Sequence, residues 1–210
     1  MNKKYFETRF VYKKGRDSVW KAISEDLQQY ISSSDVVLDI GTGYGNFINN
    51  IKAGEKHAAD MNRDVKKYMD EDVKFHAIDA TKVGTLLHNH FDVVFASNFL
   101  EHLGQDELDT FFSGVKKILK KKGRVIFVQP NYRYCADTYW DDYTHKTVFT
   151  HISLADYLET KGFHVKVMKK KYVPFSMKVR VPKSYWLTKL YLKMPIKPMA
   201  SQMLCVAELE

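Results

Sequence analysis

The sequence has little cysteine and no long apolar run. Its 210 residues include two cysteines, Cys135 and Cys205, which are too few for the disulfide framework of a small secreted domain. They form no Cys-x-x-Cys or Cys/His pattern of a zinc site. No stretch approaches the roughly 18 consecutive apolar residues of a membrane span, and the N-terminus lacks the apolar core of a signal peptide. We therefore predict a cytoplasmic, globular protein.

The net charge of +8 is unevenly distributed. Residues 1–160 hold 22 basic and 23 acidic side chains, whereas residues 161–210 hold 11 basic and 2 acidic side chains. Segment 172–200 contains four of the five prolines, and a short aromatic and basic helix is expected within it, at 183–194. This segment is interpreted as a lid or a dimer contact, or as a peripheral membrane contact.

Short apolar runs alternate with helix-compatible segments along the chain. Strands are expected at 36–40, 57–60, 73–79, 91–96, 123–129, 163–169 and 202–209. Helices are expected at 17–30, capped by Asp17 or Ser18, directly after residue 45, at 106–117, and at 153–160, capped by Ser153. Strands that alternate with helices pair in parallel with right-handed crossovers. The sequence thus predicts a doubly wound, mostly parallel α/β sheet with helices on both faces.

A glycine turn follows the first expected strand and reads Gly41-Thr42-Gly43-Tyr44-Gly45. Glycines at such a turn let the backbone approach a ligand closely. The spacing is GxGxG and differs from the GxGxxG of dinucleotide enzymes. Taken alone, the turn is weak evidence, because many glycine turns are only tight corners.

Three acidic residues strengthen the indication of a ligand site. Asp60 ends the second strand, where a carboxylate accepts hydrogen bonds from the two hydroxyls of a ribose. Asp79 ends the third strand, where it would accept from an adenine amine, and Asp39, expected to be half-buried, would orient the glycine turn. Three acids and a glycine turn on successive strand ends indicate a nucleoside site.

Five segments together resemble class I S-adenosylmethionine-dependent methyltransferases, in order and spacing. They are VVLDIGTGYGNF, AADMN, FHAIDAT, FDVVFASNFLEHL and LKKKGRVIFVQPN, and they cover residues 36–130. The resemblance implies a Rossmann-like sheet of seven strands whose last strand, 202–209, is antiparallel and inserted between two others. One domain, 1–210, is then expected, with an N-terminal helical segment (1–34), a cofactor-binding core (35–130) and a substrate-side half (131–210).

The resemblance implies S-adenosylmethionine as the cofactor and assigns residues to its parts. The methionine part would lie on the glycine turn, at Gly41, Thr42, Gly43 and Gly45, and its carboxylate would bind Tyr12 or Arg16. Asp60 would bind the ribose, and the adenine would lie against Met61, Asp79 and Ala80. The sulfonium would lie above Ser97, Asn98 and Phe99.

The stretch after the fifth strand, DDYTHKTVFTHISLADYLETKGF, resembles a segment of bacterial relatives that modify sugars or polysaccharide intermediates. A hydroxyl acceptor needs a base or a metal, and histidine is the usual base. His145 is the expected base, with Asp141 or Asp142 orienting it. His102 is a second candidate, although its position in an EHL turn is more typical of a structural or shielding residue.

No metal is expected, because the acidic residues at 106, 107 and 109 look like the first turn of a helix. The predicted reaction is therefore methyl transfer to a small or carrier-linked metabolite, with O-methylation of a sugar-like hydroxyl favoured.

Other classes of protein fit less well. An RNA methyltransferase would account for the charge, but the Asn/Asp-Pro-Pro-Tyr/Phe signature of adenine-N6 enzymes is replaced here by Ser97-Asn98-Phe99-Leu100. The sequence therefore disfavours nucleic acid as a partner. A nicotinamide oxidoreductase would need the GxGxxG spacing, and the intact glycines and acids argue against a non-catalytic binding protein.

Overall fold

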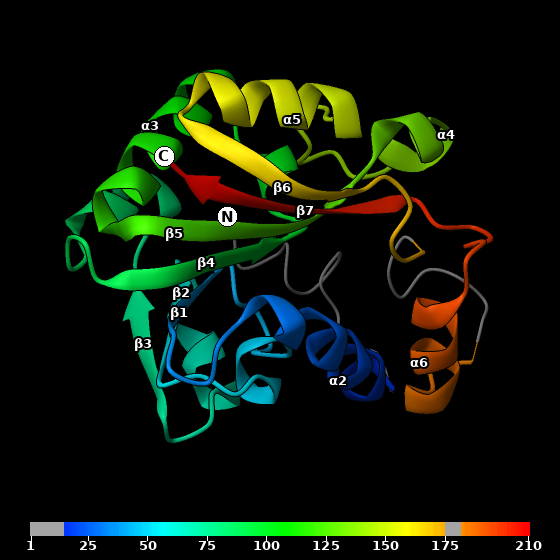
Figure 1. The fold of residues 1–210 in the computed structure, drawn as a ribbon, viewed down its shortest axis with the longest axis horizontal. Helices are drawn as coiled ribbons and strands as arrows, with labels where there is room; N and C mark the ends of the chain where they lie inside the picture. Colours follow the sequence, from blue (N-terminus) through cyan, green and yellow to red (C-terminus); the bar gives the residue numbers. More distant parts are fainter. Residues whose placement is uncertain (1–14, 175–181) are drawn as a thin grey trace.

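A computed structural model describes residues 15–174 and 182–210, which form a seven-stranded sheet in the order β3-β2-β1-β4-β5-β7-β6 (Figure 1). The strands are β1 Val36–Ile40, β2 Glu55–Asp60, β3 Val73–Ala77, β4 Phe91–Ser97, β5 Leu119–Pro130, β6 Phe163–Lys169 and β7 Gln202–Leu209. Strands β1 to β5 pair in parallel, and β7 pairs antiparallel with both β5 and β6. The predicted fold, with its inserted antiparallel strand, is confirmed.

Helices cover both faces of the sheet. On one face lie α3 (Gln105–Ile118) and α5 (His151–Thr160), and on the other lie α2 (Arg16–Leu27) and α6 (Tyr185–Lys193) (Figure 1). The expected helix within the proline-rich segment is therefore present as α6. A single turn, α4 (Ala136–Tyr139), lies in the connection between β5 and α5.

Short 3₁₀ helices occupy most of the connections between the first five strands. They are η2 Ile48–Asn50, η3 Arg63–Tyr68, η4 Ala80–Thr85 and η5 Leu100–His102; η1 Gln28–Tyr30 lies between α2 and β1, and η6 Tyr132–Tyr134 follows β5.

The prediction of an α-helix after the glycine turn is wrong. Only the η2 turn forms there, and Ile51 is already extended, with φ −96° and ψ 159°. The side-chain amide of Asn50 donates to the Asn46 carbonyl, four residues earlier, at 2.9 Å. Asparagine side chains that bond to the backbone favour turns over helix interiors, so the segment stops after one turn.

Two helix starts differ from the expected caps. The residue before α2 is Gly15, with φ 84°, so that Asp17 and Ser18 lie inside the first turn. The cap of α5 is Thr150, whose hydroxyl accepts the Ser153 N–H at 3.1 Å. Ser153 is the third residue of the helix, and its own hydroxyl accepts the Thr150 N–H at 2.9 Å in a reciprocal capping box.

Two apolar clusters pack the helices onto the two faces of the sheet. Phe111 and Phe112 of α3 are fully buried on one face, and Leu27 of α2 is fully buried on the other. Each such side chain stabilises the fold by roughly 1.5–3 kcal/mol. Within the described residues, no helix is both long and apolar enough to cross a membrane.

Candidate active site

A cavity of about 920 Å³ lies at the carboxyl ends of β1, β2 and β4, within the size range of ligand pockets. Its walls come from the glycine turn after β1, from α2 and α6, and from the loop at 142–146. Ligands of doubly wound sheets bind at this edge, where the strand order reverses. The cavity therefore coincides with the predicted cofactor site.

The glycine turn forms one wall of the cavity through its first three residues. Gly41 has φ 68°, and a Cβ atom on it would lie 2.8 Å from the Phe99 ring. Gly45 has φ 67° but faces away, since a Cβ atom there would lie 2.8 Å from Cε of Met69. Gly45 thus shapes the turn and is not among the residues that line the cavity.

Asp60 ends β2 and supports the glycine turn. Its Oδ2 accepts the Gly43 N–H at 3.1 Å, and its Oδ1 accepts the Asn62 N–H at 2.9 Å. Burial raises the pKa of Asp60, while these two N–H groups oppose the rise. Each carboxylate oxygen has about two acceptor directions, so that within residues 15–174 and 182–210 each retains one for a ribose hydroxyl. The residue therefore fits the predicted cofactor.

Asp39 is fully buried, and the expectation of a half-buried side chain is wrong. Its carboxylate accepts the Thr42 hydroxyl at 2.7 Å. Burial raises the pKa of Asp39 to about 7, the Thr42 bond opposes the rise, and the charge of Asp60 adds to it. Asp39 positions the turn through Thr42.

The expected adenine end of the cavity is lined by Met61, Asp79 and Ala80. Met61 is 47% exposed and so presents an apolar surface to a ligand. Asp79 lies two residues beyond the end of β3, and its Oδ1 accepts both the N–H and the hydroxyl of Thr81 at 2.8 Å. Burial opposes ionisation, but these bonds hold the pKa of Asp79 below its usual value. Among the described residues its second oxygen accepts no hydrogen bond, so that it can accept from an amine.

The expected floor residues Ser97, Asn98 and Phe99 also line the cavity. Asn98 has φ 48°, a left-handed conformation that asparagine tolerates better than most residues. Its side-chain oxygen accepts from the Gln202 amide, and the Phe99 N–H donates to Gln129 Oε1 at 3.2 Å. Sequence reasoning missed both glutamines, although each is a polar residue at the end of an apolar strand.

Arg16 lines the cavity from the first turn of α2. Its Nε donates to Asn46 Oδ1 at 2.6 Å, and Asn46 in turn donates to Asp17 at 2.6 Å. These contacts hold the Arg16 guanidinium beside the glycine turn, where a carboxylate is expected. Tyr12, the alternative candidate, lies outside the described residues.

The two candidate histidines lie together, with ring centroids 5.0 Å apart. Thr144 donates its hydroxyl proton to Asp142 Oδ1 at 2.7 Å, so its 2.9 Å contact with Nδ1 of His102 requires the ring to donate. The His102 tautomer therefore has its proton on Nδ1 and a lone pair on Nε2. The Asp142 carboxylate, which the sequence paired with His145, positions His102 through Thr144.

Burial and the neighbouring His145 lower the pKa of His102 to about 4, which makes the imidazole neutral at pH 7. Burial raises the pKa of Asp142, but the Thr144 hydrogen bonds outweigh it, and the net pKa lies below its usual value. Ionised Asp142 is then an acceptor only, which agrees with the assigned tautomer.

Glu101 is a site residue to which sequence reasoning assigned no role. It is 3% exposed and lines the cavity, and burial, followed by the Asp142 charge, raises its pKa to about 8. The available signal was a carboxylate inside an apolar run. Glu101, His102 and His145 offer ligand atoms within 4.8 Å of one another, so that the expected absence of a metal remains a prediction.

Comparison with known proteins identifies the class. Residues 12–166 match the family described as "Methyltransferase domain", and the chain belongs to this family. A search of curated proteins finds no match. The family assignment confirms the sequence prediction of a class I methyltransferase that uses S-adenosylmethionine, and it excludes the nicotinamide oxidoreductase alternative.

Solved structures share the fold. A SAM-dependent methyltransferase from Archaeoglobus fulgidus is 22% identical with TM-score 0.66, covering 90% of this chain and 94% of its own. A protein from Pyrococcus horikoshii OT3 is 17% identical with TM-score 0.70, covering 100% of both chains. The 1,6-didemethyltoxoflavin-N1-methyltransferase of Burkholderia thailandensis, solved with S-adenosylhomocysteine, is 18% identical with TM-score 0.60, covering 92% and 79%.

Proposed function

We propose that the protein transfers the methyl group of S-adenosylmethionine to a hydroxyl oxygen of a small or carrier-linked, sugar-like acceptor. The contacts from Asp142 through Thr144 to His102 support this most strongly, because they hold a neutral imidazole in the same cavity as the glycine turn. A hydroxyl must lose its proton when its oxygen is methylated, and a positioned imidazole accepts it. The cofactor supplies an activated methyl group, and the protein supplies position and proton removal.

Within this proposal, Nε2 of His102 is the proton acceptor. His145 packs against it and against Tyr139, whose ring centroid lies 4.4 Å away. We therefore assign His145 a packing and shielding role, which reverses the order of the two histidines that the sequence favoured.

Of the interpretations of segment 172–200, the proposal adopts the lid. The acceptor would then lie beneath α6, the helix of this segment. Tyr185 and Lys189 of α6 contact Glu25 of α2 at 2.6 and 2.9 Å, which ties the helix across the cavity. Its cavity-lining residues are largely apolar: Leu187, Leu190 and Tyr191, with Met194 directly after the helix. Such a wall favours an acceptor, or an acceptor carrier, with an apolar face beside the reacting hydroxyl.

The test is methyl transfer from labelled S-adenosylmethionine to a panel of free and carrier-linked hydroxyl compounds. His102→Gln is expected to lower kcat about 100-fold with little change in the acceptor KM, and the matched variant His145→Gln to lower it less than tenfold. Because the proton acceptor must be neutral and kcat/KM reports the free enzyme, the wild-type kcat/KM should fall on the acid side near pH 4.

Two results would contradict the proposal. A panel in which only nitrogen or carbon acceptors are methylated would reject the hydroxyl acceptor. A larger loss of kcat in His145→Gln than in His102→Gln would assign proton removal to His145.

A further inference from the structure

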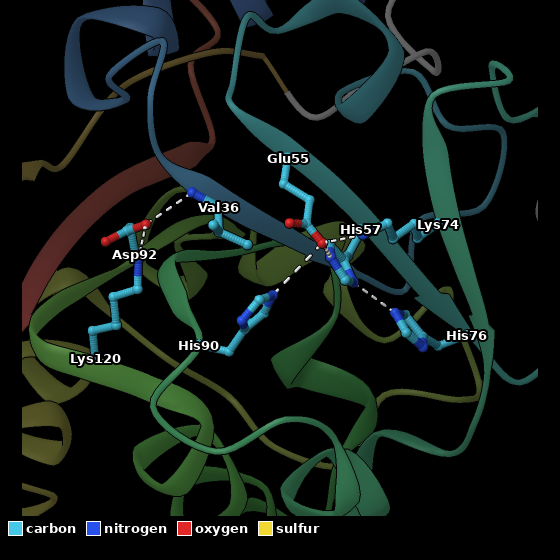
Figure 2. Close-up of polar contacts among 8 residues, drawn as sticks. All are labelled: Val36, Glu55, His57, Lys74, His76, His90, Asp92 and Lys120. Carbon is cyan, nitrogen blue, oxygen red and sulfur yellow. Dashed lines mark hydrogen bonds and ion pairs between the residues drawn. The ribbon is translucent and has the colours of Figure 1, made fainter.

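A second group of histidines lies away from the cavity, toward the amino ends of β2 and β4. Glu55 and His57 lie on one face of β2, and Lys74 and His76 on β3 beside it, while His90 directly precedes β4. Figure 2 shows these five side chains pointing toward one another. The proposed methyl transfer uses none of them.

Three nitrogen atoms converge on one carboxylate oxygen. Oε1 of Glu55 lies 2.6 Å from Nε2 of His57, 2.5 Å from Nζ of Lys74 and 3.6 Å from Nε2 of His90 (Figure 2). Nε2 of His90 is buried and makes no hydrogen bond within the described residues. The ligand atoms of Glu55, His57 and His90 all lie within 4.8 Å of one another.

These separations are close to those of a metal site. A tetrahedral zinc ion with bonds near 2.0–2.1 Å keeps its ligand atoms roughly 3.3 Å apart. The Glu55 to His90 separation of 3.6 Å already fits, and the Glu55 to His57 separation of 2.6 Å must widen by less than 1 Å. Glutamate oxygen and imidazole nitrogen are both zinc ligands.

The remaining nitrogen of His57 is held in the way that metal-binding histidines require. Its Nδ1 lies 2.7 Å from Nε2 of His76, and the two rings are stacked at 5.0 Å. When Nε2 of His57 gives its lone pair to a metal, the ring proton lies on Nδ1 and is donated to His76. Such an outer partner fixes the ring and its tautomer.

The ammonium group of Lys74 lies beside Glu55, in the position that a metal ion would take. The two groups are 2.5 Å apart, but the Lys74 side chain is 63% exposed, so that it can leave for solvent. We propose that Glu55, His57 and His90 bind a divalent ion of the zinc class, with the Lys74 ammonium displaced and His76 positioning His57. Bound zinc would join β2 to the start of β4 across β1.

The experiment is equilibrium dialysis of the full chain against Zn²⁺, with Co²⁺ absorption to report the coordination. His90→Ala is expected to weaken zinc binding at least tenfold, and Lys74→Met to tighten it. His88→Ala is the matched control, because this exposed histidine lies on the same loop and its side chain hydrogen-bonds to the Gly84 carbonyl. His145→Ala removes a ligand from the cavity group and should leave this site intact.

The proposal is overturned if the wild-type protein takes up no zinc, or if His90→Ala binds zinc as His88→Ala does. It is also overturned if zinc is lost in His145→Ala and retained in His90→Ala, since the ion would then lie in the cavity. Weaker binding by Lys74→Met would contradict displacement of the ammonium group.

Discussion

Two groups at opposite ends of the strands each bring one glutamate together with two histidines, and the two glutamates differ in charge state. Glu101, beside the cavity, is buried near Asp142, and its pKa is raised to about 8. Glu55, toward the amino end of β2, accepts from Lys74 and His57, and its pKa is lowered to about 2. The same residue types are thus a neutral acid in one place and an anion in the other.

This difference separates what the two groups do. Metal ligands must be deprotonated, so a cation that binds at Glu101 has to displace a proton, whereas Glu55 is already charged. The cavity group therefore suits proton transfer to neutral His102, and the other group suits a cation.

The largest effect is expected from the acid at the other end of β2. Asp60→Ala removes an acceptor for the ribose hydroxyls and should weaken S-adenosylhomocysteine binding by about 3 kcal/mol, or about 100-fold. Glu55→Gln on the same strand should leave this affinity unchanged. Titration calorimetry measures both, and similar affinities for the Asp60→Ala and wild-type proteins would remove Asp60 from the site.

The sequence predicts the sheet well and the cavity only in part. Buried strands such as β4 are apolar runs with clear ends, and the glycine turn and Asp60 follow such ends directly. The position of Asp142 depends on a contact between distant segments. The loop after β5 comes back to the turn after β4, where the N–H of Lys146 donates to the Glu101 carbonyl at 2.8 Å. No local pattern encodes that contact, so the sequence assigned Asp142 to the nearer histidine.

Glu101→Gln is expected to stabilise the protein at neutral and alkaline pH. Between the ordinary pKa of 4.5 and the folded value of about 8, the folded state keeps a proton that the unfolded state releases, so stability falls as pH rises. Glutamine does not ionise and lacks this loss. After allowing for relaxation around the buried group, we expect about 2 kcal/mol at pH 8 and no difference near pH 4. Urea unfolding across this range is the measurement, and a difference independent of pH would refute the assignment.

Glu55→Gln should have a smaller effect of the opposite sign. The pKa of Glu55 is lowered from 4.5 to about 2 by Lys74 and then His57, so its contribution to stability is present above pH 4.5 and is lost as pH falls toward 2. Because Lys74 is exposed, solvent screens the pair, and we expect a loss under about 1 kcal/mol at pH 7. The same unfolding series measures it, and a gain of stability at pH 7 would break the contrast with Glu101.

The smallest effect is expected from a chelator on catalysis. EDTA added to zinc-loaded protein should lower the melting temperature, because removal of the ion from Glu55, His57 and His90 removes its binding free energy from the folded state. The rate of methyl transfer in the same sample should not change, because Glu101 holds a proton at neutral pH and His102 acts without a metal. A rate that EDTA abolishes and magnesium restores would place the ion at Glu101, His102 and His145 instead, and the two glutamates would no longer differ in function.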